Sequence, residues 1–191
     1  MNTDINSAVL KPVHSESEIA AVAGLASQIW NEHFTPILGQ AQVDYMLENF
    51  QSADAIRKAV NRDGYRYYFI MTPENKTAGY CAVQPRIDAL YLSKLYIAKP
   101  FRGRKLAVAV IGALCTTAAR EHLPTIRLNC NRFNKNTLAI YDRLGFRIIK
   151  EEKESIGNGF YTDDYVLEKT LTVAKIVSKP NGTELPNRSS N

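Results

Sequence analysis

In the first third of the chain, apolar residues recur three and four positions apart, the spacing of one face of an α-helix. Ser15–Glu18 has the pattern of a capping box, and a helix is predicted from there to about Asn31. A second helix is predicted over residues 40–50, and a third over residues 53–60 with Ser52 as its N-cap. The N-terminal part of the chain is therefore expected to be helical.

At residue 65 the pattern changes to short runs rich in β-branched and aromatic residues, which are typical of strands. Turn-forming residues at 73–76 and at Pro85 separate these runs. Short turns of this kind join antiparallel neighbours. The pattern thus predicts three consecutive antiparallel strands, at residues 65–71, 77–84 and 89–97.

The second half of the chain alternates helix and strand. Helical periodicity returns from Leu106 to Thr117, and Pro124 ends it. A short helix is predicted over residues 136–144, with Gly145 at the position after its end. The remaining runs predict strands at residues 125–130, 146–155 and 160–167.

Length and composition predict one domain followed by a tail. The chain has 191 residues, of which 45% are hydrophobic, and this size fits a single domain at residues 1–173. Residues 174–191 contain few apolar residues and are predicted to form a mobile tail. No apolar run is long enough to span a membrane, and the first residues lack the features of a signal peptide, so a cytoplasmic protein without a membrane partner is expected.

The three cysteines, Cys81, Cys115 and Cys130, are widely spaced within apolar stretches. Buried free thiols are predicted there in preference to disulfides or catalytic cysteines. No cluster of ligands with metal-binding spacing is found either, so no metal site is expected.

Positive charge is concentrated in one segment of the sequence. Residues 90–150 contain 12 Lys and Arg but only two acidic residues, Glu121 and Asp142, whereas the parts before and after carry a net negative charge. Such an excess indicates a polyanionic ligand or a nucleic-acid surface, the alternative being a solvated basic surface. No pattern of stacking aromatic residues accompanies the charge, so nucleic acid is not the predicted partner.

Within this segment, a basic turn lies between a predicted strand and a predicted helix. Arg102-Gly103-Arg104-Lys105 directly precedes Leu106 and Ala107, where the helix is predicted to begin. The first N–H groups of a helix lack partners and its dipole is positive there, so such a turn can bind an anion.

A second motif follows about 30 residues later. Asn134 lies seven residues before Tyr141, and Tyr141 lies four before Gly145-Phe146. Together, the basic turn and this block resemble the acetyl-CoA signature of the GNAT (GCN5-related N-acetyltransferase) family. The resemblance implies an α/β fold with a mixed, mostly antiparallel central sheet of about six or seven strands flanked by helices.

The resemblance also implies roles for individual residues. In this family the backbone of Leu95, Tyr96 and Ile97 would pair with the pantetheine arm of acetyl-CoA. Residues 102–107 would bind the pyrophosphate, Asn134 would contact the pantetheine or hold neighbouring backbone, and Tyr141 would protonate the leaving thiolate. Lys105 departs from the family pattern, which usually has glycine there. The Lys105 side chain therefore either contacts phosphate or limits the approach of the backbone to it.

The function implied is an acetyl-CoA-dependent N-acetyltransferase that transfers the acetyl group directly to a primary amine of a small molecule or a protein. The alternative is a CoA-binding sensor or adaptor without turnover. The acceptor and the oligomeric state, monomer or homodimer, are left open by the sequence. Candidates by residue type for the general base are Glu32, His33, Asp44, Tyr45, Tyr161, Asp163 and Asp164, each of which is more typical of a solvated or capping residue.

Overall fold

The computed structural model describes residues 9–171 of the chain. Its N-terminal half begins with a short strand followed by four helices, α1 (Glu16–His33), α2 (Thr35–Leu38), α3 (Gln40–Phe50) and α4 (Ala53–Asn61). The predicted caps of α1 and α4 are confirmed: the Ser15 hydroxyl accepts a hydrogen bond from the N–H of Glu18 at 3.2 Å, and the Ser52 hydroxyl accepts one from the N–H of Ala55 at 3.2 Å. Helix α1 ends two residues beyond the predicted Asn31, and the single turn of α2 was not predicted.

A seven-stranded sheet forms the centre of the molecule, with the order β1-β2-β3-β4-β5-β7-β6. All neighbouring strands are antiparallel except β4 and β5, which are parallel. The predicted mixed, mostly antiparallel sheet is therefore confirmed, although the four residues of β1 were too few to be predicted. The strands are β1 (Val9–Pro12), β2 (Arg66–Met71), β3 (Thr77–Pro85), β4 (Leu90–Ile97), β5 (Thr125–Asn131), β6 (Arg147–Gly157) and β7 (Phe160–Thr170).

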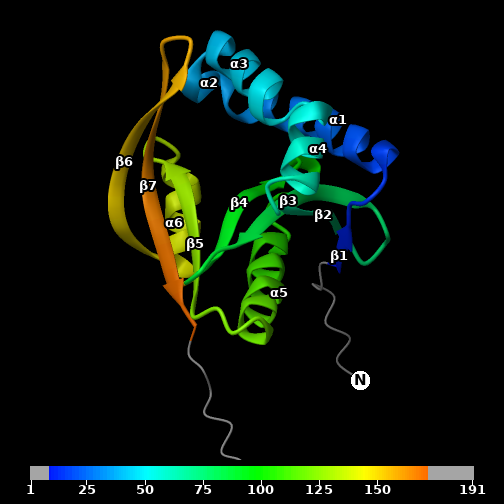
Figure 1. The fold of residues 1–191 in the computed structure, drawn as a ribbon, viewed down its shortest axis with the longest axis vertical. Coiled ribbons are helices and arrows are strands. Elements are labelled where there is room, and N and C mark those ends of the chain that lie inside the picture. Colours follow the sequence, from blue (N-terminus) through cyan, green and yellow to red (C-terminus); the bar gives the residue numbers. More distant parts are fainter. Residues whose placement is uncertain (1–8, 172–191) are drawn as a thin grey trace, which may run out of the picture.

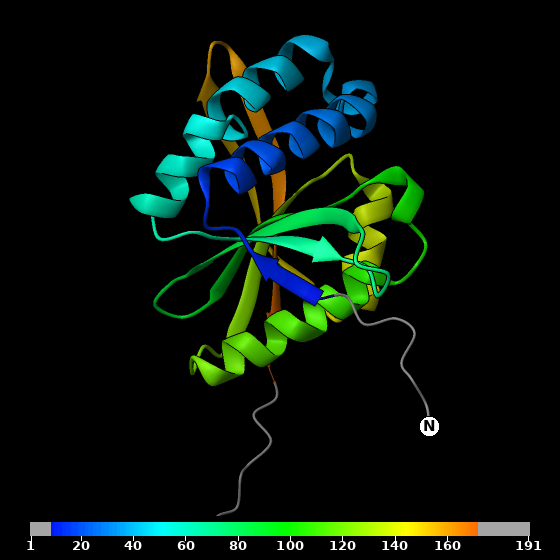
Figure 2. The ribbon, with the colours of Figure 1, turned by 90° about the vertical axis from the view of Figure 1, so that its right-hand side faces the viewer.

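Helices cover both faces of the sheet (Figures 1 and 2). Helices α1 to α4 lie on one face of β1 to β4, and α5 (Leu106–Arg120) lies on the other face, with α6 (Lys135–Arg143) beside β5 and β7. Side chains of a strand alternate between the two faces, so the sheet contributes to two cores. Cys81 and Val83 pack in the core under α5, whereas Tyr80 and Ala82 pack in the core under α1.

The described residues include no helix that is both long enough and apolar enough to cross a bilayer. The predicted domain boundary at residue 173 and the predicted tail at residues 174–191 lie outside the described residues.

Candidate active site

Strands β4 and β5 separate soon after they begin. They pair only at Leu90 with Ile126 and at Tyr91 with Arg127. Further along, β4 has a bulge at Ser93, because Leu92 pairs with Val83 of β3 and Lys94 pairs with the preceding Ala82. A bulge bends a strand and increases its twist. From Leu92 to Ile97, β4 therefore has no partner strand on its β5 side among the described residues, and its backbone groups are left open there.

The turn between β4 and α5 presents a run of backbone N–H groups. Gly103 and Lys105 have φ angles of 78° and 57°, in the left-handed region, so the chain coils tightly before α5 begins. Among the described residues, the N–H groups of residues 103–108 donate no hydrogen bond, and the first to do so is Ala109, which bonds to the Lys105 carbonyl at 3.2 Å. Consecutive free N–H groups at a turn and a helix N-terminus bind anions. The turn thus fits a pyrophosphate through its backbone.

Two arginines of this turn pair with carboxylates. Arg102 donates from Nε to the Ile97 carbonyl at 2.9 Å, and its Nη1 lies 3.3 Å from Glu32 at the end of α1. Arg104 lies 3.6 Å from Glu74. Exposed pairs of this kind contribute about 1 kcal/mol or less, so a phosphate can compete with the carboxylates for both arginines.

Lys105 is exposed and forms no ion pair with a described residue. Because its φ of 57° suits glycine, Lys105→Gly should leave the turn intact. We favour phosphate contact by this side chain, so the substitution should weaken acetyl-CoA binding by about 1 kcal/mol and flatten its salt dependence, as measured by calorimetry at several ionic strengths.

Lys105→Asn is the matched control for this prediction, because asparagine tolerates a left-handed conformation but carries no charge. If charge matters, both variants bind acetyl-CoA more weakly. Tighter binding by Lys105→Gly would instead show that the lysine side chain obstructs the turn.

Asn134 is buried at the start of α6, and its side chain reaches α1. It caps no backbone N–H of α6, and its Nδ2 lies 3.3 Å from Nε2 of His33. An amide nitrogen only donates, so His33 must accept through a neutral imidazole. Burial, together with the nearby charge of Arg102, lowers the pKa of His33 and favours this neutral form. The end of α1 is thereby tied to the start of α6, while contact of Asn134 with pantetheine stays a prediction.

Tyr141 of α6 is 7% exposed, and its ring lies 5.3 Å from that of Phe146. Burial raises the pKa of its phenol well above the ordinary value. The hydroxyl is therefore protonated at neutral pH, as an acid must be. None of the described residues accepts a hydrogen bond from it, so the proton is available to a ligand.

The three predicted residues of β4 face opposite sides of the sheet. Leu95 and Ile97 pack against the core under α5, whereas Tyr96 packs on the α1 side, with its ring 5.5 Å from Trp30. The pKa of Tyr96 is raised by burial and also by the proximity of Tyr141. The two phenols therefore approach each other from opposite faces of the sheet, where β4 and β5 separate.

Most candidates for the general base are engaged elsewhere. Glu32 pairs with Arg102, His33 contacts Asn134, and Tyr45 donates from its hydroxyl to the Ile156 carbonyl at 2.6 Å. Gln40 donates to Asp44, Asp163 pairs with Arg132, and Tyr161 is exposed. Among the carboxylate and imidazole candidates, Asp164 is the one for which the described residues provide no hydrogen bond or ion pair.

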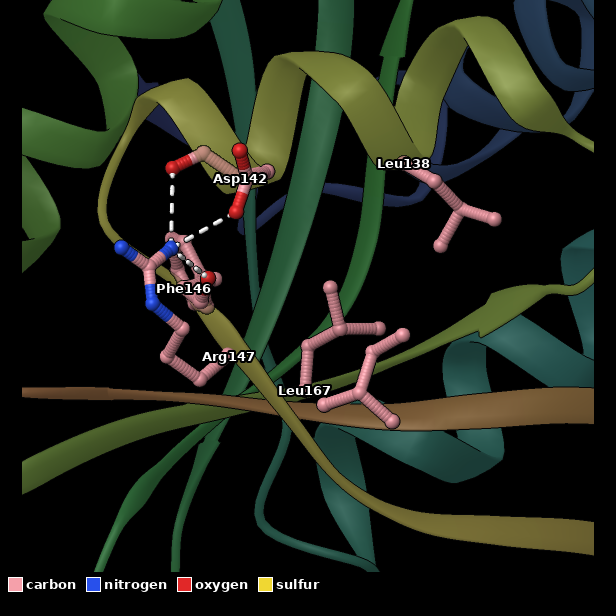
Figure 3. Close-up of a pocket in the computed structure, with 6 residues that line it drawn as sticks. Leu138, Asp142, Phe146, Arg147 and Leu167 are labelled. Carbon is pink, nitrogen blue, oxygen red and sulfur yellow. Dashed lines mark hydrogen bonds and ion pairs between the residues drawn. The ribbon is translucent and has the colours of Figure 1, made fainter.

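Two shallow hollows lie on either side of β7. The first has a volume of about 240 Å³ between α6, β6 and β7, where Arg147 pairs with Asp142 at 2.7 Å (Figure 3). It contains none of the predicted site residues, and its apolar lining comes from Leu138 and Leu167 among others. The second, of about 250 Å³, is lined by Tyr91, Asn129, Glu152 and Val166 among others.

The polar residues of this second hollow were not predicted. The signal available in the sequence was the alternation in β5, where Arg127, Asn129 and Asn131 share one face and the intervening residues are buried.

Comparison with known proteins identifies the family of the chain. A model of the family described as "Acetyltransferase (GNAT) domain" matches residues 34–166. The chain therefore belongs to the GNAT family and is an acetyltransferase. A search of curated proteins finds no match.

Solved structures of this family share the fold at low identity. A GCN5-related N-acetyltransferase from Rhodopseudomonas palustris aligns with a TM-score of 0.72 and 15% identity, covering 90% of this chain and 100% of the other. The PaiA N-acetyltransferase from Thermoplasma acidophilum, in complex with coenzyme A, aligns with a TM-score of 0.68 and 14% identity, covering 86% and 99%. A mutant spermidine N-acetyltransferase from Vibrio cholerae aligns with a TM-score of 0.60 and 16% identity, covering 86% and 94%.

Proposed function

We propose that the chain transfers an acetyl group from acetyl-CoA directly to a primary amine. The observation that carries the proposal is the run of free N–H groups at residues 103–108, beside the open edge of β4. A pyrophosphate bound at that turn would let the pantetheine arm extend along residues 95–97 toward Tyr141. The bound coenzyme A in the Thermoplasma structure supports this class of donor.

The chemistry follows from the groups that meet in the gap between β4 and β5. A backbone N–H of residues 95–97 would polarise the thioester carbonyl, a role that needs no particular side chain. The neutral amine would attack this carbonyl and expel the thiolate. Tyr141 would protonate the thiolate: burial raises the pKa of its phenol, so the hydroxyl keeps its proton at neutral pH, and the same burial disfavours the charged thiolate and makes it a stronger base.

Acetyl-CoA consumption by the purified protein tests the proposal. The acceptors to compare are a polyamine, an amino sugar, an amino acid and a peptide with a free amine, with spermidine included because a neighbour in fold acetylates it. Turnover with any of these supports the proposed function. Tight binding of acetyl-CoA without turnover would instead favour a CoA-binding sensor.

Arg102 tests the cofactor site separately from turnover. If its guanidinium moves from Glu32 to a phosphate, Arg102→Ala should weaken acetyl-CoA binding by roughly 1 to 3 kcal/mol, the range for a charge-assisted hydrogen bond, as measured by calorimetry.

Glu32→Gln is the matched control, because it removes the competing carboxylate and keeps the arginine. This variant should bind acetyl-CoA as tightly as the parent or more tightly. Equal losses in the two variants would mean that the pair only holds the turn in place, and unchanged affinity in Arg102→Ala would contradict the phosphate contact.

A further inference from the structure

Asp164 on β7 differs from its sequence neighbour in having no hydrogen-bond or ion-pair partner in the part of the chain that the structure describes. Asp163 accepts from the Arg132 guanidinium at 3.1 Å, and Arg132 also contacts the Tyr165 hydroxyl at 3.3 Å, so both neighbours of Asp164 are held on one face of the sheet. Asp164 points to the other face and is partly buried there. A partly buried carboxyl without a hydrogen bond is unfavourable, and such groups are found at functional sites.

The strand register places Asp164 on a polar face that includes the second hollow. It lies beside Asn131 of β5 and Glu152 of β6. Glu152 accepts from Asn129 at 3.0 Å, and Asn129 in turn is 3.3 Å from the Tyr91 hydroxyl of β4. This polar face therefore extends from β6 across β7 and β5 to Tyr91 of β4.

Helix α3 reaches the far end of the same hairpin. Gln42 donates to the Tyr161 carbonyl at 2.8 Å, and the Tyr45 hydroxyl donates to the Ile156 carbonyl. Figure 1 shows the β6–β7 hairpin rising to meet α2 and α3. Asp164 lies three residues after Tyr161 on β7, on the face of the sheet that also carries Asn131 and Glu152.

The charged groups around Asp164 are mostly negative. Burial and the carboxylates of Asp163, Glu152 and Glu154 together raise the pKa of Asp164 to about 6. The nearby cation Lys150 is taken by Glu152 at 2.6 Å. These surroundings therefore suit a cationic ligand, and an acceptor ammonium is such a ligand. The other titratable groups near Asp164 are the Tyr91 and Tyr96 phenols of β4 on the same face and the Cys130 thiol of β5, which belongs to the core on the opposite face.

Asp164 and Tyr141 approach the gap between β4 and β5 from opposite faces. Tyr141 belongs to the core under α5, whereas the Tyr96 phenol on the other face is close enough for its pKa to be raised by both Tyr141 and Asp164. A thioester in the gap would have the proposed acid on one side and an unpaired carboxylate on the other.

We propose that Asp164 is the catalytic base that binds the acceptor ammonium and removes its proton; this role rests on the proposed acetyl transfer. The Asp164 carboxylate takes one proton from the ammonium, and the freed lone pair forms the N–C bond to the thioester carbonyl. The C–S bond breaks, and Tyr141 gives its proton to the sulfur. The new amide nitrogen returns its second proton to the Tyr141 phenolate, and Asp164 releases one proton to solvent.

The test uses the full-length protein with acetyl-CoA, and n-butylamine and spermidine as acceptor probes. For the parent, kcat/KM for the amine should fall as the pH drops below about 6, since Asp164 must be ionised. Asp164→Asn should lower kcat/KM by about 100-fold at pH 7.5 and remove this acidic limb, while acetyl-CoA affinity stays unchanged. Asp164→Glu should keep the limb and part of the rate.

Asp163→Asn is the matched control, because it removes the adjacent carboxylate that faces the other side of the sheet. At pH 7.5 it should keep kcat/KM within about threefold of the parent, because Asp164 is already ionised there, and it should move the acidic limb to lower pH, because Asp163 helps raise the pKa of Asp164. An unchanged rate and pH profile in Asp164→Asn would overturn the role of Asp164 while leaving acetyl transfer intact. If the parent transfers acetyl to neither probe and to no amine of the screen above, both proposals are overturned. If Asp164→Asn fails to fold, the parent's pH profile tests the role of Asp164, and the absence of an acidic limb would overturn it.

Discussion

Tyr141→Phe should lower kcat by roughly 10- to 10⁴-fold and leave acetyl-CoA affinity nearly unchanged. The hydroxyl acts as negative charge develops on the sulfur, so its loss affects the transition state far more than the ground state. Phenylalanine keeps the ring that packs 5.3 Å from Phe146, and the described residues offer the hydroxyl no hydrogen bond that would be lost. Steady-state kinetics and calorimetry on both proteins measure the two quantities.

Tyr67→Phe is the control for removing a buried phenol elsewhere. Tyr67 is 3% exposed in the core under α1, and burial likewise raises its pKa. Its substitution should leave kcat within about twofold, because a residue remote from the reacting atoms contributes nothing specific to the transition state. If Tyr141→Phe behaves like Tyr67→Phe, Tyr141 has no part in the chemistry.

Gly79→Ala should lower the free energy of unfolding by about 3 kcal/mol or more, the upper range for forcing an extra group into a packed site. A Cβ on Gly79 would collide with the Tyr96 carbonyl oxygen and lie 3.0 Å from the Ile97 Cα. Both neighbours are backbone atoms of β4, which cannot move without opening the sheet. Urea denaturation of both proteins measures the loss.

Gly112→Ala in α5 is the matched control for added volume. A Cβ there meets nothing within 4 Å, and alanine favours helix over glycine, so stability should rise by about 0.5 to 1 kcal/mol. A Gly79→Ala protein as stable as the parent would show that β4 can shift away from β3. Such a shift would also move residues 95–97, so its acetyl-CoA affinity should be measured as well.

Local patterns predicted most of the elements. The capping box at Ser15 and the spacing of apolar residues after it act within a few turns, and α1 begins where they indicate. The same holds for α5, which the basic turn precedes, and for α6, which Gly145 follows with a φ of 86°. The β1 strand was missed because four residues hold too little periodicity, and its pairing with β2 is made by distant residues.

Several features of the site depend on residues far apart in the chain. Asn134 meets His33 across 101 positions, and Arg102 meets Glu32 across 70, so no local pattern could indicate either contact. No local pattern indicates the separation of β4 from β5 either, because strand pairing and the bulge at Ser93 are properties of the assembled sheet.

The sequence by itself determined where the helices and most strands lie, where the basic turn and Tyr141 fall along the chain, and the family to which they point. These properties follow from short-range periodicity, capping and spacing, which act between residues near in the sequence. The tertiary structure alone decided which of the candidate carboxylates has no hydrogen-bond or ion-pair partner within residues 9–171. Asp163 and Asp164 are adjacent in sequence and alike in chemistry, but the alternation of a strand places one beside Arg132 and the other on the opposite face of the sheet.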